Sequence, residues 1–70
     1  MTPNNTYLKE MGRKIKGARI ALRITLPTMA KLAKTDMSNY WFIEKGERNV
    51  HILTLKSIAD VLNMDVKDFI

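Results

Sequence analysis

Cysteine is absent from this 70-residue sequence, histidine occurs once, and no long apolar run is present. A chain without cysteine forms no disulfide and carries no thiol chemistry, and one histidine does not provide the ligand set of a zinc or iron site. No segment approaches the roughly 20 apolar residues that span a bilayer, and the N-terminus lacks the charged-then-apolar pattern of an export leader. We therefore expect a cytoplasmic protein with no membrane association, no metal and no cofactor.

The length and composition are those of one small domain. Hydrophobic residues make up 46% of the chain and charged residues 27%, which is typical of soluble globular proteins. A domain of this size buries only about 60% of the surface of its unfolded chain, which makes it a candidate for oligomerisation. We expect residues 1–6 to form a loose N-terminal arm and residues 7–70 to form a single domain.

Basic residues are concentrated in the first half of the chain. Residues 1–35 contain eight Lys or Arg and one acidic residue, a net charge of +7, whereas residues 36–70 contain four and six, a net charge of −2. The whole chain carries +5. A small domain with one strongly basic half is typical of proteins that bind a polyanion, most often nucleic acid, although a solvated helix face has the same composition.

Two stretches have the apolar spacing of an amphipathic helix. The apolar positions are Leu8, Met11, Ile15, Ala18 and Leu22 in the first stretch and Leu55, Ile58, Ala59 and Leu62 in the second. Gly12 and Gly17 either permit close packing of the first helix or weaken it, by about 1 kcal/mol each. Asn63 tolerates a left-handed conformation, so the second helix is predicted to end near it.

Start and stop signals between these stretches predict two short helices in close succession. Thr25 is expected to cap a helix over about residues 26–34, and the Asp36 carboxylate is expected to cap a second helix that runs to about Lys45. Gly46 is expected to end it. Because only two or three residues separate the two helices, they must cross steeply, which is the geometry of a helix-turn-helix unit.

The end of the chain has the pattern of a short fifth helix. Asp65 and Asp68 are spaced like a weak capping box, and the turn that they open carries Val66, Phe69 and Ile70. No segment alternates with the two-residue period of a strand. We therefore predict an all-α fold of five helices, in which the last turn either closes the core or pairs with a second copy.

Four consecutive residues of the predicted third helix are aromatic or apolar: Tyr40, Trp41, Phe42 and Ile43. Successive residues are 100° apart around a helix, so they cannot all face one core. The spacing places Tyr40 and Ile43 inward. Trp41 and Phe42 then either contact DNA or a protein partner, or one of them folds sideways onto the domain's own surface.

The order and spacing of these residues resemble the Cro/phage-repressor helix-turn-helix family, which includes restriction-modification controller proteins. The matching pieces lie between Met11 and Phe69 and are Ile15 with Arg19, Ile24-Thr25, Met29-Ala30, Ile43-Glu44-Lys45-Gly46, Arg48-Asn49 and the run from Leu55 to Met64. The resemblance implies a compact, lambda-repressor-like domain of five helices with the helix-turn-helix at helices 2 and 3. It also implies a transcriptional regulator that binds double-stranded DNA.

The resemblance further assigns roles in DNA binding. The positions that correspond to base-reading residues are Met37, Ser38, Asn39 and Phe42, of which Asn39 also lies near a phosphate in similar proteins. Trp41 is a further contact to DNA or to a partner. The positions that correspond to backbone contacts are Lys16, Thr28, Lys31, Lys34, Lys45, Arg48 and Asn49.

Two structural roles also follow from the resemblance. Arg19 and Glu44 correspond to a partly buried ion pair that ties the first helix to the recognition helix, in keeping with the rule that charges are rarely buried unless paired. Val66, Phe69 and Ile70 correspond to a homodimer interface, which would place two recognition helices one turn of DNA apart on a palindromic operator.

Three features depart from the family pattern. Leu26 stands at the start of the second helix, where a Gln often contacts phosphate and a recognition-helix side chain, so that contact should be absent. Lys34 occupies the turn where Gly commonly adopts a left-handed conformation, which costs other residues roughly 1–2 kcal/mol, so either the turn differs slightly in this chain or it tolerates the strain. Met37 and Trp41 cannot make the bidentate hydrogen bonds that distinguish guanine or adenine. Specificity is therefore expected to rest on the polar residues of that face, on contact with thymine methyls and on DNA shape.

A dimeric regulator of double-stranded DNA is the function that these observations favour, and two other classes remain open. One is an antitoxin or adaptor that binds a protein partner through Trp41 and Phe42. The other is a non-specific nucleic-acid binder. Nothing in the sequence resembles a nucleophile with its base, a phosphate-binding glycine loop or a metal cluster, and His51 has no second ligand nearby, so we expect no enzymatic activity.

Overall fold

The computed structural model of this chain describes residues 3–70, with side chains from Thr6 onward. It contains four α-helices and one 3-10 turn, which are α1 (Pro3–Ala21), α2 (Leu26–Leu32), α3 (Met37–Lys45), α4 (Ile52–Leu62) and η1 (Val66–Asp68). The all-α fold is confirmed. The fifth helix is instead a single 3-10 turn, because the backbone N–H groups of Asp68 and Phe69 bond three residues back rather than four.

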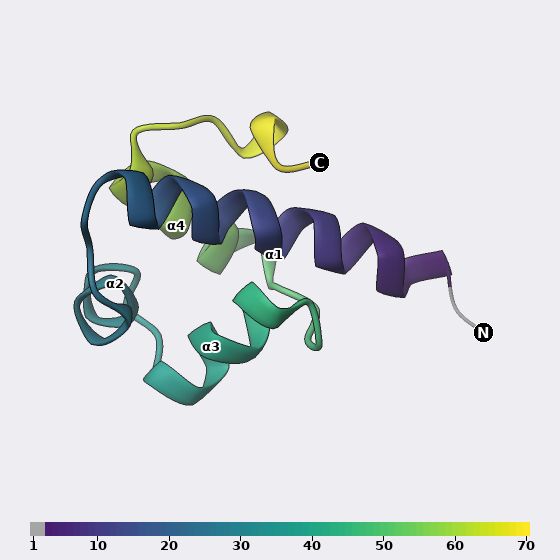
Figure 1. Ribbon diagram of the computed structural model, residues 1–70, viewed down its shortest axis with the longest axis horizontal. Coiled ribbons are helices and arrows are strands. Elements are labelled where there is room, and N and C mark those ends of the chain that lie inside the picture. Colours follow the sequence, from purple (N-terminus) through teal and green to yellow (C-terminus); the bar gives the residue numbers. More distant parts are fainter. Residues whose placement is uncertain (1–2) are drawn as a thin grey trace.

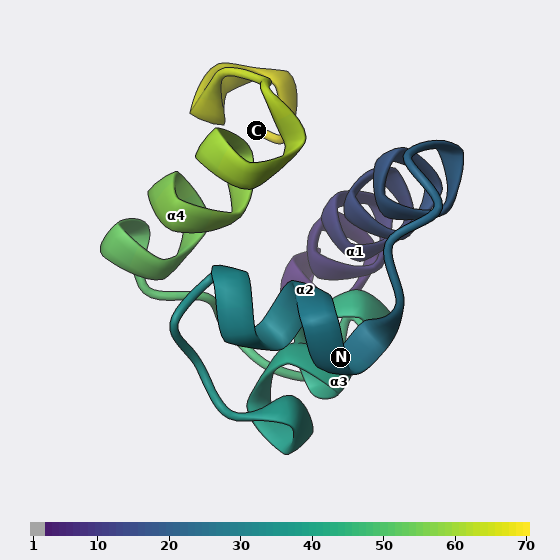
Figure 2. The same ribbon diagram turned by 90° about the vertical axis from the view of Figure 1, so that its left-hand side faces the viewer.

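The four helices pack around one core. α1, the longest helix, packs on both α3 and α4 (Figure 1). α2 lies beyond the C-terminal end of α1 and packs against α3 and α4 (Figure 2). In both views α3 and η1 lie at opposite sides of the molecule. No helix within residues 3–70 combines the length and the apolar character that a membrane crossing requires.

The bounds of α1 differ from those that the apolar spacing indicates. The helix begins at Pro3, so the expected loose arm is helical from that residue, and residues 1–2 lie outside the described part of the chain. The helix ends at Ala21, and Arg23 adopts a left-handed conformation with φ of 61°. This turn directs Leu22 away from the core: its side chain is 52% exposed, and the prediction that it belongs to the buried stripe is wrong.

The helix-turn-helix has the predicted start and stop signals, with one exception. Thr25 Oγ1 accepts a hydrogen bond of 3.3 Å from the backbone N–H of Thr28, and Gly46 ends α3 with φ of 73°. Asp36 precedes α3 as predicted, but its exposed carboxylate makes no capping hydrogen bond, so the expected side-chain cap is wrong. Lys34 adopts φ of 62°, so of the two alternatives for this turn the structure has the left-handed residue with its backbone strain.

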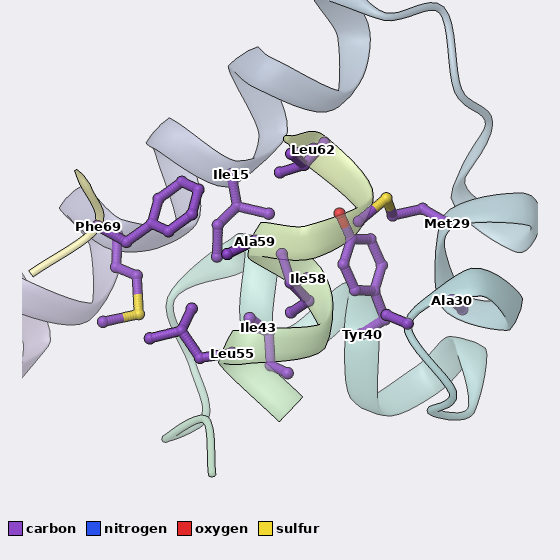
Figure 3. Packing of buried hydrophobic residues seen from close by; sticks show 12 residues of the cluster. Ile15, Met29, Ala30, Tyr40, Ile43, Leu55, Ile58, Ala59, Leu62 and Phe69 are labelled. Atoms are coloured by element: carbon purple, nitrogen blue, oxygen red, sulfur yellow. The ribbon is translucent and has the colours of Figure 1, made fainter. Parts of the chain in front are cut away.

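The core draws on all four helices and on the residue that follows η1. The buried apolar residues are Met11, Ile15, Met29, Ala30, Ala33, Tyr40, Ile43, Leu55, Ile58, Ala59, Leu62 and Phe69. Figure 3 shows Phe69 in the same cluster as Ile15 and Leu55, and its side chain is 2% exposed. Phe69 therefore closes the core of its own chain. This corrects the expectation that all three apolar residues at the C-terminus face a second copy.

Gly12 allows the backbones of α1 and α3 to approach each other. A Cβ at Gly12 would lie 2.3 Å from the carbonyl oxygen of Glu44 and 2.6 Å from that of Ile43, so a side chain here would overlap the α3 backbone. A Cβ at Gly17 would meet nothing within 4 Å. Of the two alternatives that the sequence left open for these glycines, close packing applies to Gly12.

Candidate nucleic-acid interface

A buried ion pair fixes α3 against α1. Arg19 Nε donates a hydrogen bond of 2.7 Å to Glu44 Oε2, and Arg19 Nη2 donates one of 3.3 Å to Glu44 Oε1. Arg19 Nη1 also donates to the carbonyl oxygen of Ile24 at 2.7 Å, just before α2. Both charged residues are only 8% exposed. One guanidinium thus connects α1, the approach to α2 and the recognition helix, which sets the direction in which α3 points.

Tyr40 completes this buried group. Its hydroxyl donates a hydrogen bond to Oε2 of Glu44, and its side chain is fully buried. Burial raises the pKa of the Tyr40 hydroxyl well above its ordinary value, and the bond to Glu44 adds to this shift. The hydrogen bond to Glu44 also raises the pKa of the Arg19 guanidinium. Sequence reasoning placed Tyr40 in the core but missed its hydroxyl contact, for which the i, i+4 spacing to Glu44 is the signal.

The exposed face of α3 is apolar and hollowed. Met37 is 52% exposed, Trp41 is 42% exposed, and Ser38 between them is exposed as well. A hollow of about 220 Å³ is lined by these three residues and by Leu26 at the start of α2. We call this the α2–α3 hollow. Leu26 therefore faces α3 from the position where similar helix-turn-helix proteins often have a polar residue.

A second hollow lies on the other side of Trp41. It has a volume of about 200 Å³ and is lined by Leu26 and Trp41, by the Arg19–Glu44 pair and by two lysines, Lys16 and Lys45. The Glu44 carboxylate is already bonded to a guanidinium and a hydroxyl. The charges that this hollow can offer to a phosphate are therefore the two ammonium groups, of which that of Lys45 also lies 3.8 Å from the exposed Glu47 carboxylate.

Two cations lie over the aromatic rings of α3. Lys45 Nζ is 4.3 Å from the centre of the Trp41 ring, and Arg48 Cζ is 4.9 Å from the centre of the Phe42 ring. Both distances are within the range of cation–π attraction. The rings contact each other, with centroids 5.3 Å apart. The aromatic pair therefore restrains the long side chains of Lys45 and Arg48 beside the recognition helix.

Asn39 and Phe42, which the resemblance assigns to base reading, are engaged within the chain. Arg48 Nη1 donates a hydrogen bond of 3.0 Å to Asn39 Oδ1, and Asn39 Nδ2 donates one of 2.8 Å to Thr35 Oγ1. Both side chains are half-buried, and both contact Arg48. Their contacts position the guanidinium, whereas Met37 and Ser38 are the exposed pair at the start of α3.

The seven residues that the resemblance assigns to the DNA backbone are all exposed: Lys16, Thr28, Lys31, Lys34, Lys45, Arg48 and Asn49. The Thr28 hydroxyl accepts a hydrogen bond of 2.9 Å from the Thr25 hydroxyl. Lys45 Nζ is 3.8 Å from a carboxylate oxygen of Glu47, but both side chains are more than 40% exposed. Because exposed ion pairs are weak, this contact leaves Lys45 free to exchange a carboxylate for a phosphate.

Three acidic residues gather away from α3, whereas Asp36 and Glu47 lie at its two ends. Asp60 near the end of α4 and Asp65 and Asp68 around η1 line a hollow of about 330 Å³, and η1 lies on the opposite side of the molecule from α3 (Figures 1 and 2). The electropositive surface around α3 is the one suited to a polyanion.

The remaining candidate residues lie near the C-terminus. Ile70 is 63% exposed, Val66 is half-buried, and Phe69 is buried in the core. Two further apolar residues that sequence reasoning did not single out, Ile52 and Leu53 at the start of α4, are 58% and 66% exposed. Of the three residues assigned to a dimer interface, Ile70 and part of Val66 are accessible to a second copy.

No family model and no curated protein sequence matches the chain. Solved structures do. The restriction-modification controller protein C.AhdI from Aeromonas hydrophila superposes with a TM-score of 0.88 at 25% identity, over 93% of this chain and 98% of that one. Two structures of the clp gene regulator ClgR from Corynebacterium glutamicum give TM-scores of 0.87 and 0.86 at 21% and 20% identity, over 96% and 99% of this chain and 71% and 88% of theirs.

Proposed function

Starting from the Cro/C1-type helix-turn-helix fold that this chain has, we propose that it is a sequence-specific regulator of transcription that binds double-stranded DNA as a dimer on a palindromic operator. The observation that carries the proposal is the surface of α3. The first turn of α3 is exposed, and two restrained cations, Lys45 and Arg48, lie beside the aromatic rings of the same helix. The acidic residues around η1 lie on the far side of the molecule. The chain acts as a binding protein and not as an enzyme.

DNA binding would proceed through the start of α3. In this fold the N-terminal residues of the recognition helix enter the major groove. Met37 and Ser38 are then the residues that meet base edges, and the Ser38 hydroxyl is the one of the two that can both donate and accept a hydrogen bond. Asn39 and Phe42 would act through Arg48, which they hold.

Phosphate contacts would supply most of the affinity. Lys16, Lys45 and Arg48 surround α3, and Thr28, Lys31, Lys34 and Asn49 extend the exposed polar surface along α2 and the following loops. Contacts of this kind release counterions from DNA, so the binding constant should fall steeply as salt rises. Occupation of a promoter region would then exclude RNA polymerase, or recruit it where the site lies just upstream.

Dimer formation would use the accessible C-terminal residues Val66 and Ile70. The proposal requires a two-fold axis that leaves both copies of α3 on one side of the dimer, about one turn of DNA apart, so that each copy contacts one half-site. Binding would then depend on protein concentration as well as on DNA sequence.

A protein partner in place of DNA is favoured by one observation, the apolar lining of the α2–α3 hollow by Leu26, Met37 and Trp41. An antitoxin or adaptor would use this surface for an apolar segment of its partner. Trp41 is the single tryptophan of the chain, so its fluorescence reports directly on the contested surface. A change in Trp41 emission on addition of an enriched duplex supports the DNA-binding proposal, and no change with a bound duplex argues for the alternative.

The test of the proposed function is selection from randomised duplexes at near-physiological salt. The proposal predicts enrichment of an inverted repeat with half-sites about 10 base pairs apart. Repeating the selection with Ser38→Ala should change the preferred base at one or two positions of each half-site and leave the others intact. Binding without enrichment of any sequence, or no binding by the folded protein, would contradict the proposal.

A further inference from the structure

The α2–α3 hollow is a concave feature beside the exposed start of α3. Leu26 lines it from α2, and Met37, Ser38 and Trp41 line it from α3. Met37 and Trp41 are four residues apart and so lie on the same face of the helix. The Ser38 hydroxyl is the polar group of this lining, apart from the indole N–H of Trp41.

We propose that the α2–α3 hollow receives the 5-methyl group of a thymine in the major groove, so that the protein selects thymine at that position of each half-site. This inference rests on the proposed DNA-binding function and names the chemical group that is recognised. The thymine methyl is the apolar group that base pairs present in the major groove. Leu26, Met37 and Trp41 provide an apolar wall for it, and Ser38 provides a hydroxyl for the neighbouring O4 or for the adjacent base.

The charges beside the hollow favour DNA over an apolar protein segment. Lys16 and Lys45 line the adjoining hollow on the other side of Trp41, and Lys45 is held 4.3 Å from the ring. The carboxylate of Glu44 in the same region is bonded to Arg19 and Tyr40 and so does not repel a phosphate. An apolar hollow next to two exposed lysines matches a base methyl next to the phosphate backbone, which is the arrangement at the edge of a major groove.

The position of Leu26 accounts for the departure from the family pattern. Where similar proteins often have a Gln that steadies a recognition-helix side chain, Leu26 and Met37 here face a common space. An apolar contact replaces a polar one. The base would then be recognised through its methyl group instead of through a hydrogen bond.

Replacing one thymine by uracil tests the proposal because it removes only the methyl group. Burial of one methyl group contributes about 0.8 kcal/mol, so uracil at the recognised position should raise the dissociation constant about fourfold. Uracil at other positions should have little effect. Cytosine at the recognised position should bind more weakly than 5-methylcytosine, which carries its methyl at the same place.

The experiment uses the duplex obtained by selection, with each thymine replaced by uracil in turn, and measures binding of the full chain by anisotropy of the labelled duplex. Two variants remove the wall of the hollow: Leu26→Gln, which keeps the length of the side chain, and Met37→Ala, whose residue is half-exposed and outside the core. The matched control is Leu32→Ala, because Leu32 lies on α2, is 50% exposed and does not line the hollow. Thermal melting establishes that each variant folds.

The proposal is supported if one thymine per half-site shows the fourfold effect, if a folded hollow variant binds thymine and uracil duplexes equally, and if Leu32→Ala retains the difference. It is overturned, with the DNA-binding function intact, if the selected duplex binds but no thymine is sensitive, or if both hollow variants keep the discrimination. Absence of any selected duplex overturns the proposed function itself, and the inference with it.

Discussion

Replacing Arg19 by alanine should lower the free energy of unfolding by about 3–5 kcal/mol, because the change leaves the buried Glu44 carboxylate without its counter-ion. The guanidinium donates two hydrogen bonds to that carboxylate and one to the carbonyl of Ile24. After the substitution the hydroxyl of Tyr40 is the remaining donor from this group. Unfolding would release the carboxylate to water, so the variant favours the unfolded chain.

The magnitude is large relative to the stability of so small a domain. A chain of this length is expected to have a total free energy of unfolding of about 3.5–10 kcal/mol, so Arg19→Ala should bring the protein close to its unfolding threshold. The midpoint of thermal unfolding should fall by about 4–8 °C for each kcal/mol lost. Circular dichroism at the helix band, recorded during thermal and urea unfolding, measures both quantities.

Two comparisons isolate the buried charge as the cause. Lys56→Ala removes an exposed ion pair, Lys56 Nζ to Asp60 at 3.6 Å with both side chains about two-thirds exposed, and should change stability by less than about 1 kcal/mol. The triple variant Arg19→Met, Glu44→Leu and Tyr40→Phe removes both buried charges and the hydroxyl that bonds to Glu44, and should recover most of the loss. If Arg19→Ala melts at the same temperature as the parent protein, the ion pair does not hold α3 in place and the reasoning is refuted.

Three further predictions follow from the same geometry. Gly12→Ala should destabilise the protein by about 1–3 kcal/mol, since its Cβ would overlap the α3 backbone. Gly17→Ala, which has open space around its Cβ, should stabilise the protein by up to about 1 kcal/mol. Equal melting temperatures for the two variants would contradict the close packing of α1 on α3 at Gly12. The raised pKa of Tyr40 means that its contribution to stability is present below about pH 10 and is lost above it at up to about 1.4 kcal/mol per pH unit. In a Tyr7→Phe background the tyrosinate absorbance, which then reports Tyr40 alone, should rise only as the chain unfolds; a rise while the helices persist would contradict its burial. Arg48→Ala should weaken binding to all duplexes alike and reduce the slope of log K against log salt by about one unit; a change of sequence preference with an unchanged slope would assign Arg48 to base reading instead.

Local signals account for the parts of the fold that the sequence predicted. Thr25 and Gly46 mark the start and the end of the helix-turn-helix through capping rules that involve only neighbouring residues. The apolar spacing of α4 likewise depends on one helix alone. The strain at Lys34 could be predicted because the resemblance specifies a left-handed residue in that turn, and the structure has it.

The features that were missed depend on where elements meet. Leu22 has the correct spacing for the buried stripe, but the helix ends one residue before it, so the chain turns its side chain outward. Phe69 could equally have faced a partner or the core, and only the position of η1 over α1 and α4 decides between them. The hydrogen bond of the Tyr40 hydroxyl was missed for the same reason, because it depends on the packing that buries the Arg19–Glu44 pair beside it.

In the candidate site, too, some features could be predicted from the sequence and others depend on contacts between elements. Lys16, Lys31 and Lys34 come from the basic first half of the sequence, whereas the resemblance alone assigned Lys45 and Arg48 to DNA contacts. Met37 and Ser38 are exposed where the resemblance places base-reading residues. By contrast, no sequence pattern indicates that Asn39 and Phe42 contact Arg48, because that contact joins α3 to the loop after it.

The central claim, that the exposed start of α3 binds duplex DNA, is tested most directly by NMR titration of the labelled protein with the selected duplex. The account predicts the largest changes in chemical shift at the amides of Met37 and Ser38, at the indole N–H of Trp41 and at Lys45 to Arg48, with small changes around η1. Largest changes on α4 and η1, with the amides at the start of α3 unaffected, would contradict it.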